Sequence, residues 1–137
     1  MSTGFTAPGP ITVVKPSNPA AGADISYTLT YPALLVGVYA LFTASATAAS
    51  RTSQLVITDS AGATLWNGQS GSAVTASGAS GYSWSPLPFV AAGPPQLLPI
   101  PPMLILPSGA IIKTVTANIQ TGDQWSVLAF SLLRDQF

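Results

Sequence analysis

The sequence predicts an all-β protein, an antiparallel β-sandwich or barrel, on three observations. About eight runs are rich in Val, Ile, Thr and aromatic residues, several of them alternating apolar with polar side chains. Turns containing Gly, Pro, Asn or Asp separate these runs, and no stretch shows a convincing helical period. The 137 residues suit one domain with a substantial core.

The N-terminal segment, residues 1–22, contains four prolines and no sustained apolar pattern. Proline fixes φ and lacks an N–H, so the segment is predicted to be an extended arm. Within the arm, residues 11–15 have the composition of a short edge strand. The single sandwich domain is expected to occupy residues 23–137.

The first half of that domain predicts three strands. Residues 23–31 alternate apolar and polar side chains, as a half-buried strand does. Residues 34–43 are apolar on both faces, which indicates a strand covered on both sides, in a stack of sheets or at a subunit contact. Residues 44–50 continue that strand or form a loop. Residues 54–66 predict a β-hairpin whose turn contains Asp59 and Gly62.

The second half begins with a Gly- and Ser-rich stretch, residues 68–81, predicted to be a flexible strand pair or a loop, and a short strand follows at 82–84. Residues 86–102 hold seven of the 13 prolines, which predicts a long irregular loop held by packing against a partner. The remaining expected elements are strands at 103–106, 111–119 and 124–133, with turns at 107–109 and 121–123.

Composition excludes several kinds of chemistry. The chain has no Cys and no His, so an ordinary zinc site, a Ser–His or Cys–His nucleophile pair and a disulfide are ruled out. Four Lys and Arg balance four Asp, so a phosphate-tracking nucleic-acid surface is not expected. The sequence therefore predicts a protein that is not an enzyme, needs no cofactor and binds no nucleic acid.

The scarcity of charge predicts assembly. Only 6% of the residues are charged, whereas about 25% is typical. Part of the surface is therefore expected to lie in subunit contacts, and the chain in a homo-oligomer. The expected interface side chains come from the arm, from the Pro-rich loop and from one exposed aromatic position: Phe5, Ile11, Val13, Trp84, Phe89, Leu97 and Leu98.

One cation stands alone in the middle of the chain. Arg51 is expected either to hold a buried carboxylate, Asp59 or Asp123, and so fix a loop, or to be an ordinary surface residue. Both aspartates also fall in predicted turns, where their side chains would cap the local backbone.

Neither a membrane span nor a secretory signal is expected. The dense apolar part of the long uncharged stretch runs over residues 31–42, too short for a helix that needs about 20 residues to cross a bilayer. The first residues lack a basic start and a following apolar run.

Aromatic residues leave a carbohydrate-binding alternative open. Trp66 and Trp125 lie in alternating strands and are expected in the core, whereas Trp84, between serines, is the best candidate for an exposed stacking platform. Few planar polar groups accompany these aromatics, and exposed aromatics also anchor protein interfaces.

From Arg51 onward, the chain shows a series of strand and turn motifs: Arg51-Thr-Ser-Gln-Leu-Val-Ile-Thr-Asp59-Ser-Ala-Gly62, Tyr82-Ser-Trp84, Leu98-Pro-Ile, Leu106-Pro-Ser-Gly109 and Thr116-Ala-Asn-Ile-Gln-Thr-Gly-Asp123-Gln-Trp125-Ser. This pattern resembles small jelly-roll proteins encoded near the head and neck genes of tailed bacteriophages. The resemblance covers roughly residues 23–133 and implies a jelly-roll-like sandwich that forms a homotrimer. Proteins of that kind are virion components.

The resulting functional expectation is a capsid decoration, or cement, protein. It would be made in the host cytoplasm and bind a major capsid protein or another virion protein at the capsid surface, tying neighbouring capsomers together. The alternative is a receptor- or carbohydrate-binding domain of a head or tail fibre.

Overall fold

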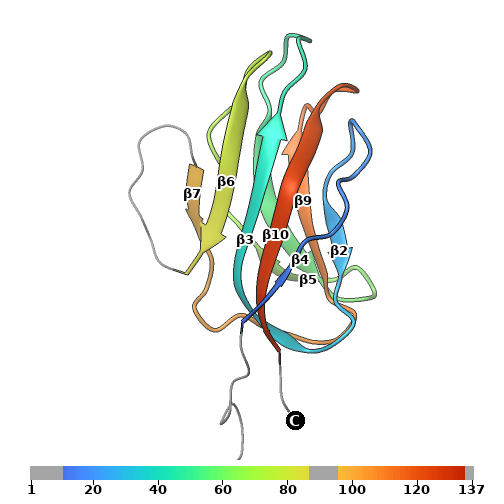
Figure 1. Cartoon of the computed structure of the whole chain (residues 1–137), viewed down its shortest axis with the longest axis vertical. Coiled ribbons are helices and arrows are strands. Elements are labelled where there is room, and N and C mark those ends of the chain that lie inside the picture. The colour runs from blue at the N-terminus through green and yellow to red at the C-terminus, as the bar shows by residue number, and fades with distance from the viewer. Residues whose placement is uncertain (1–10, 87–95, 135–137) are drawn as a thin grey trace, which may run out of the picture.

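The computed structural model describes residues 11–86 and 96–134, which form ten strands and no helix. The strands pack as two sheets face to face (Figure 1). Nothing in these two ranges is a helix able to cross a bilayer. The strands are β1 (Thr12–Val14), β2 (Ser26–Thr28), β3 (Ala33–Thr43), β4 (Thr52–Thr58), β5 (Thr64–Asn67), β6 (Ala79–Ser85), β7 (Gln96–Pro99), β8 (Ile105–Leu106), β9 (Ile111–Ala117) and β10 (Gln124–Arg134).

The strand order is that of a jelly roll. The first sheet has the order β1-β10-β3-β6-β7, with β8 also paired to β3, and the second has the order β2-β9-β4-β5. Without β7 and β8, which are inserted between β6 and β9, eight strands remain in two four-stranded sheets. Their connections pass repeatedly from one sheet to the other, as in two wrapped Greek keys. The predicted all-β, jelly-roll-like sandwich is therefore confirmed.

Alternation along the strands builds the core. In β9, Ile112, Thr114 and Thr116 are buried and alternate with Lys113 and Val115, as predicted. An aromatic cluster fills the space between the sheets, and each fully buried ring contributes roughly 1.5–3 kcal/mol of hydrophobic free energy. Its members are Phe42, Tyr82, Trp84 and Trp125, with ring centroids 4.9 Å apart for Phe42 and Trp125 and 5.3 Å apart for Tyr82 and Trp84.

Among the described residues, strand β3 is covered on one side only. Its inward side chains are buried, but Leu34, Val36 and Leu41 are only half-buried, and Tyr39 is 39% exposed. The sequence offered two explanations for a strand that is apolar on both sides, a stack of sheets and a subunit contact. Packing of the two sheets explains the apolar side chains on the inner side of β3 but not those on its outer side.

The sandwich begins earlier than residue 23. Strand β1 pairs antiparallel with β10, with Thr12 opposite Leu132 and Val14 opposite Phe130. The β-branched run suits a strand, and β10 satisfies its backbone groups at the edge of the sheet, where a neighbouring proline such as Pro16 is tolerated. Residues 1–10, including Phe5, lie outside the described residues.

The Pro-rich segment is partly a strand. Residues Gln96–Pro99 form β7, which pairs in parallel with β6, whereas the sequence predicts an irregular loop over 86–102. An edge position explains why Pro99 is accepted there. Residues 87–95, including Phe89, lie outside the described residues.

Candidate functional site

A buried ion pair lies at one end of the sandwich. Arg51 Nε donates to Asp123 Oδ2 at 2.9 Å and Arg51 Nη2 donates to Asp123 Oδ1 at 3.0 Å. Both side chains are fully buried. This two-point geometry is the strong form of an Arg–carboxylate contact. One of the two predicted structural pairings, Arg51 with Asp123, is therefore present.

The remaining polar atoms of the pair are also satisfied. The Arg51 guanidinium donates to the carbonyl oxygens of Ala49 and Thr47, each at 2.9 Å, and to Ser45 Oγ at 3.2 Å. The Asp123 carboxylate accepts from the backbone N–H of Ser45 at 2.8 Å and of Gln120 at 2.7 Å. Such full pairing is what makes a buried charge pair tolerable.

The pair joins four connections that are distant in the chain. It directly links the β3–β4 and β9–β10 connections. The Gly22 N–H donates to the Asp123 carbonyl at 2.7 Å, and Arg51 and Val74 exchange two backbone hydrogen bonds. These contacts add the β1–β2 and β5–β6 connections, which lie at the same, upper end of the molecule in Figure 1. The pair thus acts as a structural clamp on this end.

The environment keeps Asp123 ionised. Burial by itself raises the pKa of the Asp123 carboxyl, but the hydrogen bonds from Arg51 and from the backbone of Ser45 and Gln120 outweigh it. The pKa is lowered from 3.8 to about 2. The carboxylate therefore keeps its charge, and with it the clamp, down to strongly acidic pH.

The domain should become less stable as the pH is lowered through the range in which the Asp123 carboxyl takes up a proton. Because the folded-state pKa is the lower one, its stabilising contribution is present above about pH 4 and is lost as the pH falls toward 2. The loss should amount to about 2 kcal/mol. Urea unfolding of the wild type and of Asp123→Asn across this range measures it. If the free energy of unfolding fell equally steeply with pH in the two proteins, the effect would not come from Asp123.

Asp59 does not join the ion pair. Its Oδ1 accepts the backbone N–H groups of Ala61 and Ala63, each at 2.9 Å. It therefore stabilises the turn of the β4–β5 hairpin, the turn-capping alternative given by the sequence.

A second carboxylate network was not foreseen. Asp24 accepts hydrogen bonds from Thr114 Oγ1 at 2.9 Å, from Thr116 N at 3.0 Å and from Trp125 Nε1 at 3.3 Å. Thr116 Oγ1 donates to it as well, at 2.6 Å. The sequence did contain an indication, because Thr114 and Thr116 occupy one face of an alternating strand, and buried hydroxyls need a partner.

The predicted interface residues do not form one surface. Ile11 and Val13 are 54% and 52% exposed near one edge of the first sheet. Leu97 and Leu98 are half-buried on β7, at the opposite edge. The structure does not bring these two groups together.

The expectation of an exposed Trp84 is wrong, because this side chain is only 1% exposed. Trp84 shares the inward side of β6 with Tyr82, on which it stacks, and it also packs near Trp125. The flanking Ser83 and Ser85 occupy the outward positions of the same strand.

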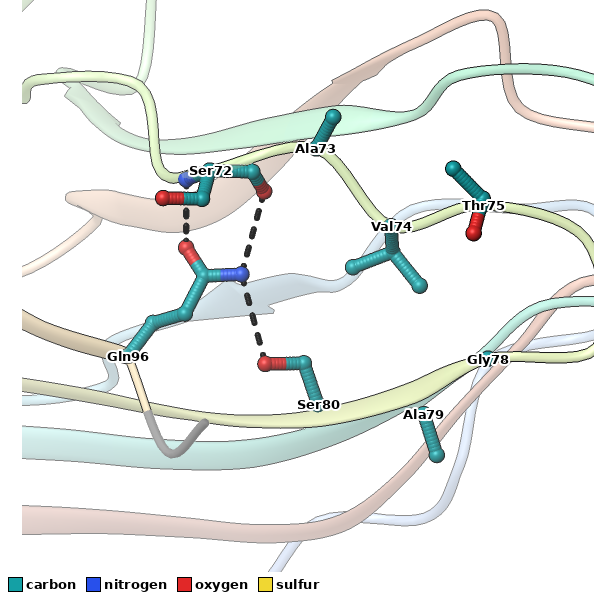
Figure 2. A pocket seen from close by; sticks show the side chains of 8 residues that line it. All are labelled: Ser72, Ala73, Val74, Thr75, Gly78, Ala79, Ser80 and Gln96. Atoms are coloured by element: carbon teal, nitrogen blue, oxygen red, sulfur yellow. Dashed lines mark hydrogen bonds between the residues drawn. The ribbon is translucent and has the colours of Figure 1, made fainter. Parts of the chain in front are cut away.

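A cavity of about 210 Å³ lies beside β6 and β7 (Figure 2). The Gln96 amide crosses it, accepting from the Ser72 N–H at 2.6 Å and donating to the Ser72 carbonyl at 3.0 Å and to Ser80 Oγ at 3.2 Å. The described residues that line it include no charged and no aromatic side chain. Because the amide is already occupied, the cavity offers little to recognise a sugar.

The outer side of the first sheet carries no charged side chain along its central strands. We call it the neutral face. A groove of about 260 Å³ crosses it over β10, β3 and β6. The outer side of the second sheet differs, since it carries the charged Lys113 and mixes the polar Gln54 and Thr52 with the exposed apolar Val115 and Leu65. The neutral face consists of Val13, Leu34, Val36, Gly37, Tyr39, Leu41, Gly81, Ser83, Ala129, Ser131 and Leu133.

Among the described residues, no three acidic side chains gather as a metal-binding cluster. The chain matches no known protein-family model, no curated protein and no solved structure. Its function is therefore inferred from the chemistry of its own residues.

Proposed function

We propose that this chain is a non-enzymatic structural protein of a bacteriophage virion, which decorates the capsid surface as a homotrimer and ties neighbouring capsomers together. The observation that carries the proposal is the distribution of charge. Arg51 and Asp123 neutralise each other in the interior. The described surface is left with few charges: Lys15, Asp24, Asp59, Lys113 and Arg134.

A surface this poor in charge suits permanent contacts. Net charge near zero favours association, and large apolar areas of a folded protein usually belong to interfaces. The interior of the described domain is built for rigidity, with an aromatic core and a clamped loop end. These properties fit a structural component of an assembly.

The positions of the Pro-rich segments support a tie between neighbours. Residues 1–10 lead into β1 and residues 87–95 lead into β7, and these strands are the two opposite edges of the first sheet. Five strands at about 4.8 Å spacing place the edges about 19 Å apart. We propose that the two segments contact different capsid subunits.

The alternative, a receptor- or carbohydrate-binding fibre domain, has less support. Its best stacking candidate, Trp84, is part of the core. The cavity beside Gln96 has no aromatic wall.

The location of the protein in the particle tests the proposal. Virions of the phage that encodes this chain would be purified, analysed by quantitative mass spectrometry and imaged by cryo-electron microscopy. We expect the chain on the shell in a copy number comparable to that of the major capsid protein. A few copies at a vertex or tail would favour the fibre alternative, and absence from the particle would overturn the virion role.

Attachment should depend little on salt. Few charges mean little long-range attraction to screen when NaCl rises from about 0.05 M to about 1 M. Sedimentation of particles at each concentration, with gel quantification of retained protein, measures this. Shedding at high salt would show that ionic contacts dominate.

Two deletions should separate attachment from folding. Removing residues 2–10 should leave the circular dichroism spectrum and the thermal transition nearly unchanged and weaken incorporation into particles. Removing residues 2–20 also removes β1 and uncovers the edge of β10, so it should destabilise the domain. Equal thermal transitions for the two deletions would mean that β1 contributes nothing to the sheet.

A further inference from the structure

We propose that the neutral face is covered by a second copy of this chain. The inference deepens the proposed function, since it rests on the homo-oligomer and assigns its contact surface. The face lies on the central strands β10 and β3 and extends onto β6 and β1.

The composition of the face calls for a partner. Its outward side chains are aliphatic, aromatic or very small, and Tyr39 at its centre is 39% exposed. Tyr39 lies opposite Ser83 on β6 and opposite Ala129 on β10. An antiparallel sheet that faces water normally alternates apolar inside with polar or charged outside. The outer row of the second sheet follows that rule only in part, with Lys113 and Gln54 beside the exposed Val115, and the neutral face has no charged side chain at all.

The side of the sheet that carries the face reaches the size of the smallest specific interfaces. The strands β1, β10, β3 and β6 are 3, 11, 11 and 7 residues long. At about 3.3 Å rise and about 4.8 Å spacing they cover a flat area of about 500 Å². Contact with an equal area of a second copy would bury about 1,000 Å² in total before surface relief is counted, the lower limit for a stable interface.

The face has relief that a partner can fit. Gly37 lies in the groove, where an added Cβ would come within 3.2 Å of the Trp84 carbonyl oxygen. Val127 lies two residues before Ala129 of the neutral face, at a bulge of β10, and is 61% exposed.

The backbone at Val127 is unusual. Its φ of 55° lies in the left-handed region, which is costly for a β-branched residue and which Gly or Asn would adopt more easily. The bulge between Ser126 and Ala129 accounts for this backbone conformation. A bulge re-aims the side chain that it carries, and here it leaves Val127 exposed to solvent.

Several features favour a second copy over another occupant. A partner without charge complementarity must itself present a neutral surface, and in the proposed homotrimer the neutral faces of the copies can meet around the three-fold axis. Edge-to-edge pairing through the first sheet is disfavoured, because β1 is three residues long and is followed within two residues by Pro16, while β7 ends at Pro99. For this sheet, contact through the face is therefore favoured over contact through an edge.

A charge placed on the face tests the inference. Ala129→Asp puts a carboxylate in the middle of the neutral face, and Val115→Asp is the matched control at an outward position of β9 in the second sheet. Light scattering after size exclusion would be measured from about 1 µM to about 100 µM. We expect the wild type and Val115→Asp to have the mass of at least two chains. Ala129→Asp should be monomeric, with self-association weakened at least about 100-fold.

Labelling provides a second measurement that does not depend on the charge variant. The chain has no cysteine, so Ser131→Cys on the neutral face and Thr28→Cys on the second sheet each introduce a single thiol. Maleimide should label Ser131→Cys slowly at high protein concentration and faster on dilution, whereas Thr28→Cys should react at one rate throughout.

The outcomes separate the two claims. A wild type that is monomeric at 100 µM would overturn both the homo-oligomer and the assigned face. An oligomer that survives Ala129→Asp, with Ser131→Cys labelled as fast as Thr28→Cys, would overturn the face alone.

Discussion

Replacing Arg51 with Ala should lower the free energy of unfolding by about 3–5 kcal/mol. The substitution leaves the Asp123 carboxylate buried without its cation, and it removes three further hydrogen bonds to Ser45, Thr47 and Ala49. Because these contacts join four connections, a cooperative loss of order at that end of the sandwich should accompany the change. Urea unfolding followed by circular dichroism measures it.

A matched variant controls for the removal of a charge. Asp59→Ala removes two backbone hydrogen bonds at a hairpin turn and should cost about 1 kcal/mol. The double variant Arg51→Leu, Asp123→Ala should lose less than the sum of its single variants, because neither charge is left unpaired. An Arg51→Ala protein no less stable than Asp59→Ala would refute the clamp.

Trp84→Ala should destabilise the domain by about 3–5 kcal/mol. Trp84 is 1% exposed and stacks on Tyr82 at a centroid distance of 5.3 Å, so its removal opens a cavity in the aromatic core. Trp66, half-buried on β5, is the control, and Trp66→Ala should cost about 1–2 kcal/mol. Thermal unfolding compares the two variants.

Fluorescence of the folded protein gives an independent check. In Trp66→Ala, the two remaining tryptophans are Trp84 and Trp125, which are both buried. Their emission should be shifted to the blue and resist quenching by iodide. Strong quenching, together with a small stability loss for Trp84→Ala, would mean that this ring reaches solvent and would restore the carbohydrate-binding alternative.

The local alternation of apolar and polar residues was sufficient to predict much of the fold. Period-two alternation predicted the strands that became β2 and β9, because side-chain direction in a regular strand depends only on position along it. It predicted β10 as a strand but not the direction of its side chains, because a bulge between Ser126 and Ala129 puts Trp125 on the same inner side as Leu128 and Phe130.

Composition indicated a short edge strand at 11–15 without its partner, and nothing in the sequence indicated β7. Strands β1 and β7 form because β10 and β6 have free edges with which they can pair. Pairing between segments that are distant in the chain cannot be detected from the sequence pattern of a few neighbouring residues.

The candidate site was predictable in part. Asp59 and Asp123 both fall in predicted turns, so the sequence could not decide which of them pairs with Arg51. The jelly-roll connections bring Asp123 within reach of Arg51. For Trp84, the flanking serines suggested exposure. The better guide was its spacing of two from Tyr82, which places both rings on one side of β6.

The place of β10 in the first sheet has a consequence for biosynthesis. This strand is the last described along the chain, yet it lies between β1 and β3, and its Trp125 completes the aromatic core. A chain still emerging from the ribosome without β10 leaves β1 unpaired and one edge of β3 open. Contacts between segments this far apart also slow folding. The domain is therefore expected to fold only once β10 has been synthesised, and its strands, which carry few charges, need protection from aggregation until then.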